Sequence, residues 1–433
     1  MISPLTSESS ATVRVTDNWL FWRKLLFRFS CIYLLLYMSP WTWLGDLPLL
    51  NVVAELYGQA EDWLVNLGNT YLFHVKDVLV PMNGSGDTSY GYAQLCLFTL
   101  IAVVGTAVWT VVDKRRNYDV GYYWLLVGVR YYVAMVALRY GIIKLFGQQM
   151  IFPSLSALAT PLGDFLPMRF SWYFIGYSTP YQFFSGAVEV LAGVLLLFRR
   201  TSTLGAFVAA SVFLNVMMMN LCYDIPVKLF SIHLFVMSNF PLLGDAQRLL
   251  NFFVFNKPTQ PAFRITIPNR RLRMVRTGLK VAFVVLFLIL PVWETYQRTS
   301  WNSNPTVKGK LTTGFFEVER FQGNVADSLR WKDLIFEQNT TGSIQTADTL
   351  LRQRYRRGYF SYALDSTKNT IAFKKSSMDT SALFTMNYTM PDTNHLLLRG
   401  KIRNDTVLIA LKRQNRHFQL AERQFHWLSE ANR

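Results

Sequence analysis

The chain divides by hydropathy into a long apolar part and a shorter polar part. Runs of about 20 residues with few charges cross the ~30 Å hydrocarbon core of a bilayer as helices. The pattern predicts seven such spans, at Lys24–Leu44, Tyr92–Val112, Tyr122–Phe146, Tyr181–Phe198, Leu204–Cys222, Leu229–Leu243 and Thr277–Trp293. After residue 302, apolar and polar positions alternate in short segments, which predicts a β-rich domain of residues 302–433.

The β-rich domain is expected to be a small antiparallel barrel or sandwich, because turn residues such as Gly323-Asn324 and Pro391-Asp392 separate its apolar runs. One helix is predicted, at Asp348–Tyr355. The predicted strands are Phe315–Phe321, Leu329–Phe336, Tyr359–Leu364, Thr370–Lys374, Leu383–Met390, His395–Ile402, Thr406–Leu411 and His417–Leu420. A barrel of this size either holds a small apolar ligand or fills its interior with side chains.

Composition supports a membrane protein. Hydrophobic residues make up 51% of the 433 residues and charged residues only 16%, against roughly 25% charged in soluble chains. This balance excludes a disordered chain, a purely soluble enzyme and a nucleic-acid-binding protein, although the net charge is +17. With the amino terminus in the cytoplasm, the outer loops hold few basic residues (Lys76, Arg169 and Lys228) and the inner segments hold many more. The positive-inside rule therefore predicts a multi-pass protein of the cytoplasmic (inner) membrane with a periplasmic or extracytoplasmic C-terminal domain.

The predicted organisation is a cytoplasmic tail (1–23), two helices with an outer loop (24–112), a four-helix core (122–243), a basic cytoplasmic loop (244–276), a last helix (277–293) and the exported domain (302–433). Cys31, Cys96 and Cys222 all fall in or at the ends of apolar helices, and the exported segment has no cysteine. We therefore expect buried thiols and no disulfide framework.

Ionisable residues inside predicted spans are the main candidates for a functional site, because a charge in hydrocarbon costs at least ~2.5 kcal/mol. Glu189 and Arg139 lie at similar depths, ~12 Å and ~10 Å from the outer ends of their helices, which suggests an ion pair. Arg130 and Lys144 share the opposite face of the same helix, so only one of the two faces can meet Glu189. With other polar residues, Glu189 and Arg139 outline a cavity open to the exterior. Those residues are Arg130, Lys144, Asn215, Asn220, His233, Asp224 and Lys228.

Two interpretations of this cluster stay open. It is a ligand-binding or proton-transfer site with Glu189 as the candidate catalytic residue, or Glu189 and Arg139 form a buried pair that fixes helix register. No metal is expected, because His233 has no second ligand at suitable spacing. A second cluster, Arg352, Arg354, Arg356 and Arg357, is either a patch for anionic lipid or an acidic partner, or a solvated face.

The block Arg130–Leu243 resembles the four-helix core of DoxX-like membrane proteins. The matching motifs are YGIIKLF at Tyr140–Phe146 and SGAVEVLAGVLLLFRRTSTLG at Ser185–Gly205, in which a helix-borne glutamate is followed by a glycine four residues later. The resemblance implies a link to quinones, and it implies Glu189 and a basic residue among Arg130, Arg139 and Lys144 as the residues to test.

Three functions are compatible with these features, and enzymatic activity stays open. The first is a membrane protein that binds a small amphipathic molecule, a quinone or a lipid, in the polar cavity, or that acts as an accessory subunit. The second is a quinone-linked membrane oxidoreductase subunit. The third is an assembly protein whose exported domain binds a protein partner. Membrane lipids are expected partners in each case.

Overall fold

The structure is a computed structural model that describes residues 18–43, 45, 47, 50–259, 269–302, 313–403, 405–423 and 425–428. Most of the predicted cytoplasmic tail and residues 260–268 of the predicted basic loop lie outside these ranges. The chain forms two compact units. The first comprises Met1–Ile142 and Gly186–Pro291, and the second comprises Ile143–Ser185 and Val292–Arg433.

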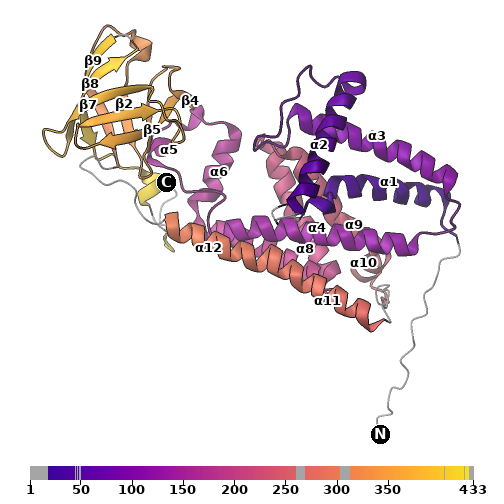
Figure 1. The fold of residues 1–433 in the computed structure, drawn as a ribbon. Coiled ribbons are helices and arrows are strands. Elements are labelled where there is room, and N and C mark those ends of the chain that lie inside the picture. The colour runs from indigo at the N-terminus through magenta and orange to yellow at the C-terminus, as the bar shows by residue number, and fades with distance from the viewer. Residues whose placement is uncertain are drawn as a thin grey trace. The chain divides into compact units, whose positions relative to one another are not determined.

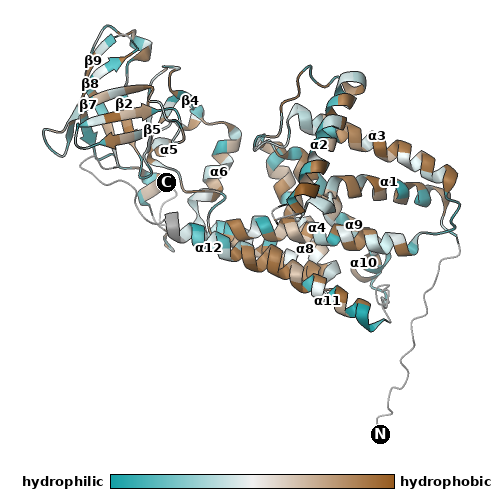
Figure 2. Ribbon diagram, in the orientation of Figure 1, coloured by the Kyte–Doolittle hydropathy of each residue, from teal (hydrophilic) through white to brown (hydrophobic). Residues whose placement is uncertain are grey.

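The described residues contain six helices that are long and apolar enough to cross a membrane, or seven if one bent pair counts as a span. They are α1 (Phe21–Met38), α3 (Ser89–Val112), α4 (Asp119–Leu145), α7 (Thr179–Leu197), α8 (Ser202–Cys222) and the run α11–η4–α12 (Arg270–Val284, Val285–Ile289 and Leu290–Asn302), with α9 (Lys228–Gly244) and α10 (Ala246–Phe253) as the bent pair. Figure 2 shows α3 as hydrophobic along most of its length, and α11 as hydrophilic at its N-terminal end. The prediction of about seven helices is confirmed, and the chain is a multi-pass membrane protein.

Close packing between α4 and α7 depends on glycine. A Cβ added at Gly141 would lie 2.9 Å from the carbonyl oxygen of Gly186 and 2.8 Å from a methyl carbon of Val190. A Cβ at Gly193 would lie 2.8 Å from Leu138. Small residues let membrane helices approach closely where there is no hydrophobic force between them. This packing holds the segment of α7 around Glu189 against α4.

The first predicted outer loop contains a helix that the sequence did not reveal, α2 (Leu50–Gly68), followed by a π-helical turn, η2 (Asn69–Phe73). A short turn, η1 (Pro40–Thr42), precedes it. The buried Val65 of α2 packs with Ala93 and Leu97 of α3. One turn of α2 is thereby fixed on the membrane helix α3.

The C-terminal domain is an antiparallel barrel (Figure 1). Its strands are β1 (Gly314–Gln322), β2 (Asp333–Phe336), β3 (Thr341–Ile344), β5 (Arg357–Asp365), β6 (Thr370–Lys374), β7 (Phe384–Thr389), β8 (His395–Ile402) and β9 (Asp405–Gln414), with β4 (Arg352–Arg354) paired on β5 and a short turn, η5 (Asp327–Leu329), before β2. Pairing of β3 with β5 and of β1 with β9 closes eight strands into a ring. The open choice between barrel and sandwich is thus settled as a barrel.

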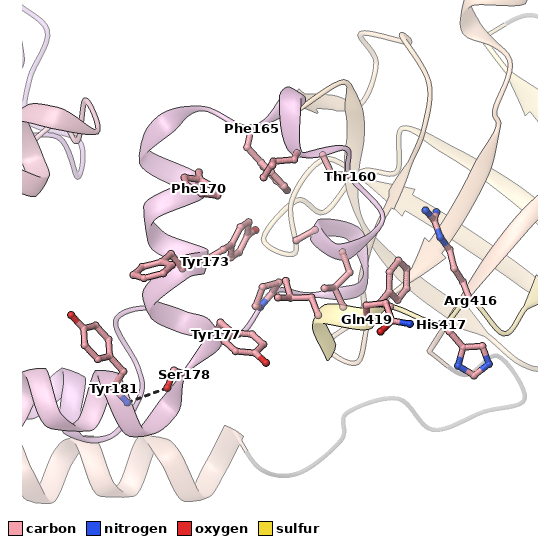
Figure 3. A pocket seen from close by; sticks show the side chains of 17 residues that line it. Thr160, Phe165, Phe170, Tyr173, Tyr177, Ser178, Tyr181, Arg416, His417 and Gln419 are labelled. Carbon is pink, nitrogen blue, oxygen red and sulfur yellow. Dashed lines mark hydrogen bonds between the residues drawn. The ribbon is translucent and has the colours of Figure 1, made fainter. Parts of the chain in front are cut away.

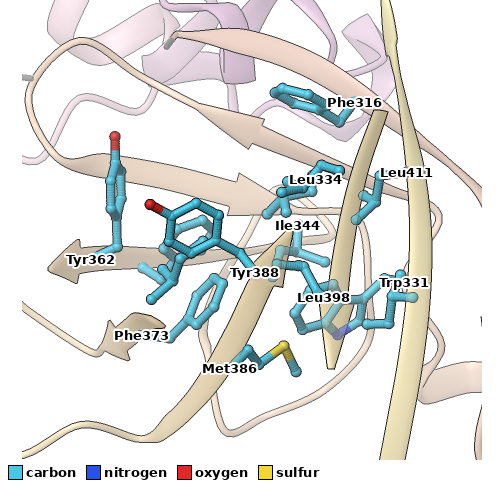
Figure 4. Packing of buried hydrophobic residues seen from close by; sticks show 14 of the residues in the cluster. Phe316, Trp331, Leu334, Ile344, Tyr362, Phe373, Met386, Tyr388, Leu398 and Leu411 are labelled. Carbon is cyan, nitrogen blue, oxygen red and sulfur yellow. The ribbon is translucent and has the colours of Figure 1, made fainter. Parts of the chain in front are cut away.

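Side chains fill the barrel interior. Phe316, Phe373 and Met386 are among a buried cluster that joins all eight strands of the ring with Trp331 (Figure 4). Small eight-stranded barrels have an interior just wide enough for such filling. The barrel interior is therefore filled by side chains.

Two predicted elements of this domain are wrong. Asp348–Tyr355 is a turn followed by β4 instead of a helix, and His417–Leu420 leads into the short helix α13 (Gln419–Glu422) instead of forming a strand. The first error arose because Asp348 accepts a hydrogen bond from the backbone N–H of Leu350 (3.0 Å), which favours a turn over a helix. The strand β3 was missed because Thr341–Ile344 is too short for a visible alternation.

The long connection from α4 to α7 is also structured, as α5 (Leu155–Leu158), η3 (Leu162–Asp164) and α6 (Pro167–Tyr177). It packs on the barrel: the backbone N–H and the hydroxyl of Ser156 both donate to Oε1 of Glu337 (2.8 and 2.7 Å). Arg169 Nε donates to the Tyr355 hydroxyl (3.0 Å). The barrel and this connection therefore form one unit.

The three cysteines are free thiols, but none is buried: Cys31 and Cys96 are half-buried, and Cys222 is exposed. The expectation that all three thiols are buried is therefore wrong.

Candidate functional site

A cavity of about 190 Å³ lies within the first unit, between α1, α3, α4 and α9. Its polar lining consists of Tyr33, Tyr37, Gln94, Tyr140 and His233. Its remaining lining is mainly apolar, from Met82, Gly86, Gly91, Leu95, Phe98, Val227, Leu229 and Phe230. We call it the tyrosine–histidine cavity. It gathers polar and aromatic groups between predicted membrane helices.

Three rings form a parallel stack in its wall. The His233 ring lies 4.0 Å from the Tyr37 ring and 5.9 Å from the Tyr33 ring, with interplanar angles of 7° and 11°. Tyr33 and Tyr37 are four residues apart on α1 and therefore share one helix face. Their mutual ring distance is 6.4 Å at 9°. The helix spacing thus places the two tyrosine rings side by side, and the packing of α9 adds the His233 ring.

Hydrogen bonds define the protonation of this stack. His233 Nδ1 lies 2.6 Å from the backbone oxygen of Leu229, and Nε2 lies 2.6 Å from the Tyr33 hydroxyl oxygen. A carbonyl oxygen only accepts, so Nδ1 carries the proton. In a neutral imidazole Nε2 then accepts, and Tyr33 donates its hydroxyl proton to it. The oxygen of Tyr33 keeps free lone pairs that a donor on a ligand can use.

Two loops beside the cavity are tied together by Asp87. Its carboxylate accepts from the backbone N–H groups of Lys228 (2.7 Å) and Leu229 (2.9 Å), at the N-terminus of α9. A carboxylate there satisfies orphan donors and complements the helix dipole. Lys228 Nζ lies 2.7 Å from Asp224 Oδ1 and 3.8 Å from Asp87 Oδ2. The predicted residues Asp224 and Lys228 therefore lie in the loop that supplies Val227 and Leu229 to the cavity.

Glu61 of α2 extends the polar network beyond the cavity. Gln94, which lines the cavity, donates from its side-chain amide to Oε1 of Glu61. Burial raises the pKa of the Glu61 carboxyl above its usual range. The titratable carboxyl of Glu61 is thus connected to the cavity through one side chain, that of Gln94.

Glu189 lies on the other side of the cavity wall. Its side chain is 1% exposed, and its charge acts on Tyr140, which lines the cavity. Glu189 is therefore adjacent to the cavity and does not line it. Its carboxylate is buried within the helical unit.

The predicted ion pair between Glu189 and Arg139 is not formed. Arg139 is exposed on α4 while Glu189 is buried, and among the described residues no ion pair involves Arg139. Similar depth along the two helices was not enough to form the pair, because the rotation of α4 about its axis directs Arg139 away from α7. Of the other basic candidates on α4, Arg130 is buried with its guanidinium 5.2 Å from the Tyr131 ring, and Lys144 is buried in the last turn of the helix.

The two asparagines of α8 do not line the cavity. Asn215 is exposed, and the buried Asn220 donates to the backbone oxygen of Val227 (3.4 Å). Of the predicted membrane cluster, the structure brings His233 to the cavity wall and places Asp224, Lys228 and Glu189 nearby. Tyr33, Tyr37, Tyr140 and Gln94 were not predicted. The available signal was two tyrosines at helical spacing in an otherwise apolar first span.

The four arginines predicted to form one surface cluster on the barrel do not share one environment. Arg357 is 2% exposed and forms two hydrogen bonds with Asp333 (2.9 and 2.5 Å) and one with the Ser343 hydroxyl (3.0 Å). Arg356 pairs with Asp164 (3.1 Å) but remains 85% exposed. Arg352 and Arg354 are exposed on β4. Arg357 is therefore not part of the predicted surface patch, and the other three stay candidates for it.

Comparisons with known proteins leave the family undefined. No family model and no solved structure matches the chain. Over 83 residues, 19% of its length, the chain is 40% identical to the uncharacterized protein YwoB of Bacillus subtilis (strain 168). The matched segment covers 54% of YwoB, so the chain spans about half the length of this curated relative. The described residues hold no group of three His, Cys, Asp or Glu side chains arranged for a metal ion.

Proposed function

We propose that this protein is a DoxX-like protein of the cytoplasmic membrane that binds a quinol, a ring-bearing amphipathic molecule, in the tyrosine–histidine cavity. In this proposal the amino terminus is cytoplasmic, the barrel is extracytoplasmic, and the cavity lies in the outer half of the membrane. The observation that carries it is the stack of Tyr33, Tyr37 and His233 in a cavity of about 190 Å³.

The stack selects for a planar ring. Aromatic groups gain about 0.5–1.5 kcal/mol from stacked or edge-on arrangements beyond the area that they bury. A cavity of this volume is smaller than those that enclose a whole drug-sized ligand, typically about 300–1,000 Å³. It therefore suits a head-group ring, while an attached apolar tail extends between helices into lipid.

The hydrogen-bond pattern selects for a hydroxyl donor on that ring. Tyr33 uses its proton on His233, so the tyrosine oxygen offers an acceptor. A quinol hydroxyl can donate to this oxygen, whereas a quinone carbonyl cannot. The same two hydrogen-bonding groups form a route for a proton that leaves the quinol ring, from Tyr33 to His233.

This proton route favours a second candidate function, a quinone-linked oxidoreductase subunit. Binding and turnover distinguish the two: a binding protein retains quinol without consuming it, and an oxidoreductase subunit with its redox partner converts quinol to quinone. The buried Glu189 beside Tyr140 would then be the residue to test for proton transfer.

Equilibrium binding tests the proposal directly. The full chain in lipid nanodiscs is titrated with a short-chain quinol, and binding is followed by quenching of tryptophan fluorescence. Tyr33→Phe is expected to weaken binding about fivefold to tenfold, the equivalent of one lost hydrogen bond of about 1–1.4 kcal/mol. Tyr37→Phe keeps the stacked ring and is the matched control, with unchanged affinity expected. Equal affinity of wild type and Tyr33→Phe would reject this cavity as the quinol site.

A further inference from the structure

The second unit contains a larger groove, of about 800 Å³, which none of the predicted site residues lines. It lies between the connection α5–η3–α6 and residues 416–420, which include the first turn of α13 (Figure 3). Its volume is within the range of cavities that bury a drug-sized ligand. It is independent of the tyrosine–histidine cavity, which belongs to the first unit.

One wall of the groove is an aromatic face of α6. Phe170, Tyr173, Phe174 and Tyr177 recur at intervals of three and four residues, so they lie along one side of the helix. Phe174 is 68% exposed. An aromatic ridge of this kind is costly to leave in water, at about 25 cal/mol per Å² of apolar surface. The groove therefore favours an apolar occupant.

The wall is held in place by contacts on both of its sides. Arg169 binds the Tyr355 hydroxyl, and the ring of Phe165 meets the Tyr355 ring edge-on at 5.3 Å. At the other end, the Tyr177 hydroxyl donates to the backbone oxygen of Arg423 (3.1 Å). The groove is thus built by anchored elements and does not depend on a single loose loop.

The opposite wall carries the positive charge. Arg416 and His417 line the groove and are both exposed. The Arg416 guanidinium lies 5.1 Å from the Phe418 ring and 5.5 Å from the Phe315 ring, which restrains it. His417 Nδ1 lies 2.9 Å from Glu422 Oε1, so this histidine is held by a carboxylate. A planar guanidinium beside an apolar groove is complementary to a carboxylate attached to an apolar chain.

The groove also ends at the start of a membrane span. Tyr181 lines it and lies in the first turn of α7, one of the helices long and apolar enough to cross a membrane. Tyrosines are enriched at the membrane–water interface. A single-chain lipid can therefore enter from the bilayer surface.

The geometry points to a binding site for one long-chain carboxylate, a free fatty acid, with the chain along the aromatic face of α6 and the carboxylate on Arg416. This site lies outside the quinol site, so each can fail without the other.

Photolabelling of the full chain in nanodiscs tests the site. The probe is palmitate with a diazirine in its chain, and labelled peptides are identified by mass spectrometry. Adducts are expected in peptides that cover residues 153–181 and 416–420. Excess palmitate is expected to suppress this labelling about tenfold more effectively than hexadecanol, which has the same chain and no charge.

Variants assign the selectivity to one residue. Arg416→Gln is expected to remove the preference for palmitate, and Arg416→Lys to keep part of it. Arg423→Gln is the matched control and should keep the full preference, because Arg423 meets Tyr177 through its backbone oxygen. The ¹⁹F resonance of the buried Trp331, in protein labelled with 5-fluorotryptophan, reports whether each variant keeps a folded barrel.

Three results would overturn the site: equal competition by palmitate and hexadecanol in the wild type, a preference that survives in Arg416→Gln, or stronger suppression by two-chain phosphatidylglycerol than by palmitate. The last result would assign the groove to a bilayer phospholipid.

Discussion

The buried ion pair of the barrel gives the sharpest prediction on stability. Replacing Arg357 by Met removes three hydrogen bonds and leaves the Asp333 carboxylate in the interior with the backbone N–H of Gln345 (3.0 Å). Removing one partner of a buried pair typically costs about 3–5 kcal/mol, because the other charge stays buried. The volume of methionine largely fills the space of the arginine stem, so the loss is electrostatic.

Thermal unfolding of the full chain, labelled with 5-fluorotryptophan, measures this loss through the ¹⁹F resonance of Trp331, which is buried in the barrel core and is one of the 12 tryptophans of the chain. A change of 1 kcal/mol shifts Tm by about 2–4 °C for a unit of 150–250 residues, so Arg357→Met is expected to lower Tm by at least ~6 °C. Arg356→Met, at the exposed neighbour, is the control and should change stability by less than about 0.5 kcal/mol. The double variant with Asp333→Leu should recover much of the loss. A Tm within one or two degrees of wild type for Arg357→Met would show that Arg357 is a surface residue and refute the assignment.

Two further variants test the helical unit. Glu61→Gln should stabilise the protein more at pH 7 than at pH 4 in thermal unfolding. Because the carboxyl pKa is raised in the folded state, the stability that the protonated Glu61 contributes is present below the pKa of the unfolded state and is lost as pH rises through the pKa of the folded state. A difference in stability between the two proteins that does not change with pH would show that Glu61 does not titrate in this way. Glu189→Gln should keep the chain monodisperse on size exclusion and leave its affinity for quinol within about twofold of wild type, because Glu189 lies behind the residues that line the cavity. A loss of affinity above about tenfold would place Glu189 in the site. Failure of the variant to fold would make Glu189 a structural residue.

Membrane helices were predictable because the bilayer penalises charge so strongly that apolar runs such as Ser202–Cys222 have no alternative structure. The strands β6 and β8 coincide with the predicted Thr370–Lys374 and His395–Ile402, because one face of each is buried and the alternation is clear. The sequence pattern predicts secondary structure less well where tertiary contacts determine it. The connection α5–η3–α6 was not predicted, and it acquires its structure from partners such as Glu337 on the barrel.

The site was only partly predictable for a related reason. His233 was identified because a histidine stands out in an apolar span, whereas Tyr33 and Tyr37 resemble ordinary interfacial aromatics until α9 is packed beside them. Depth along a helix can be counted from the sequence, but rotation about the helix axis cannot, and this is why Arg139 was paired with Glu189 incorrectly. The two-residue turn Tyr355-Arg356, with positive φ at both residues (52° and 58°), likewise has none of the Asn or Gly that marks such turns.

Photolabelling with a short-chain quinol analogue that carries a diazirine tests the central claim, that the stack of Tyr33, Tyr37 and His233 holds a quinol ring. In nanodisc-embedded wild-type protein, adducts should fall on peptides of α1 and α9, be suppressed by unlabelled quinol, and decrease in Tyr33→Phe. Adducts confined to other helices or to the barrel, or labelling that excess quinol does not suppress, would contradict the account.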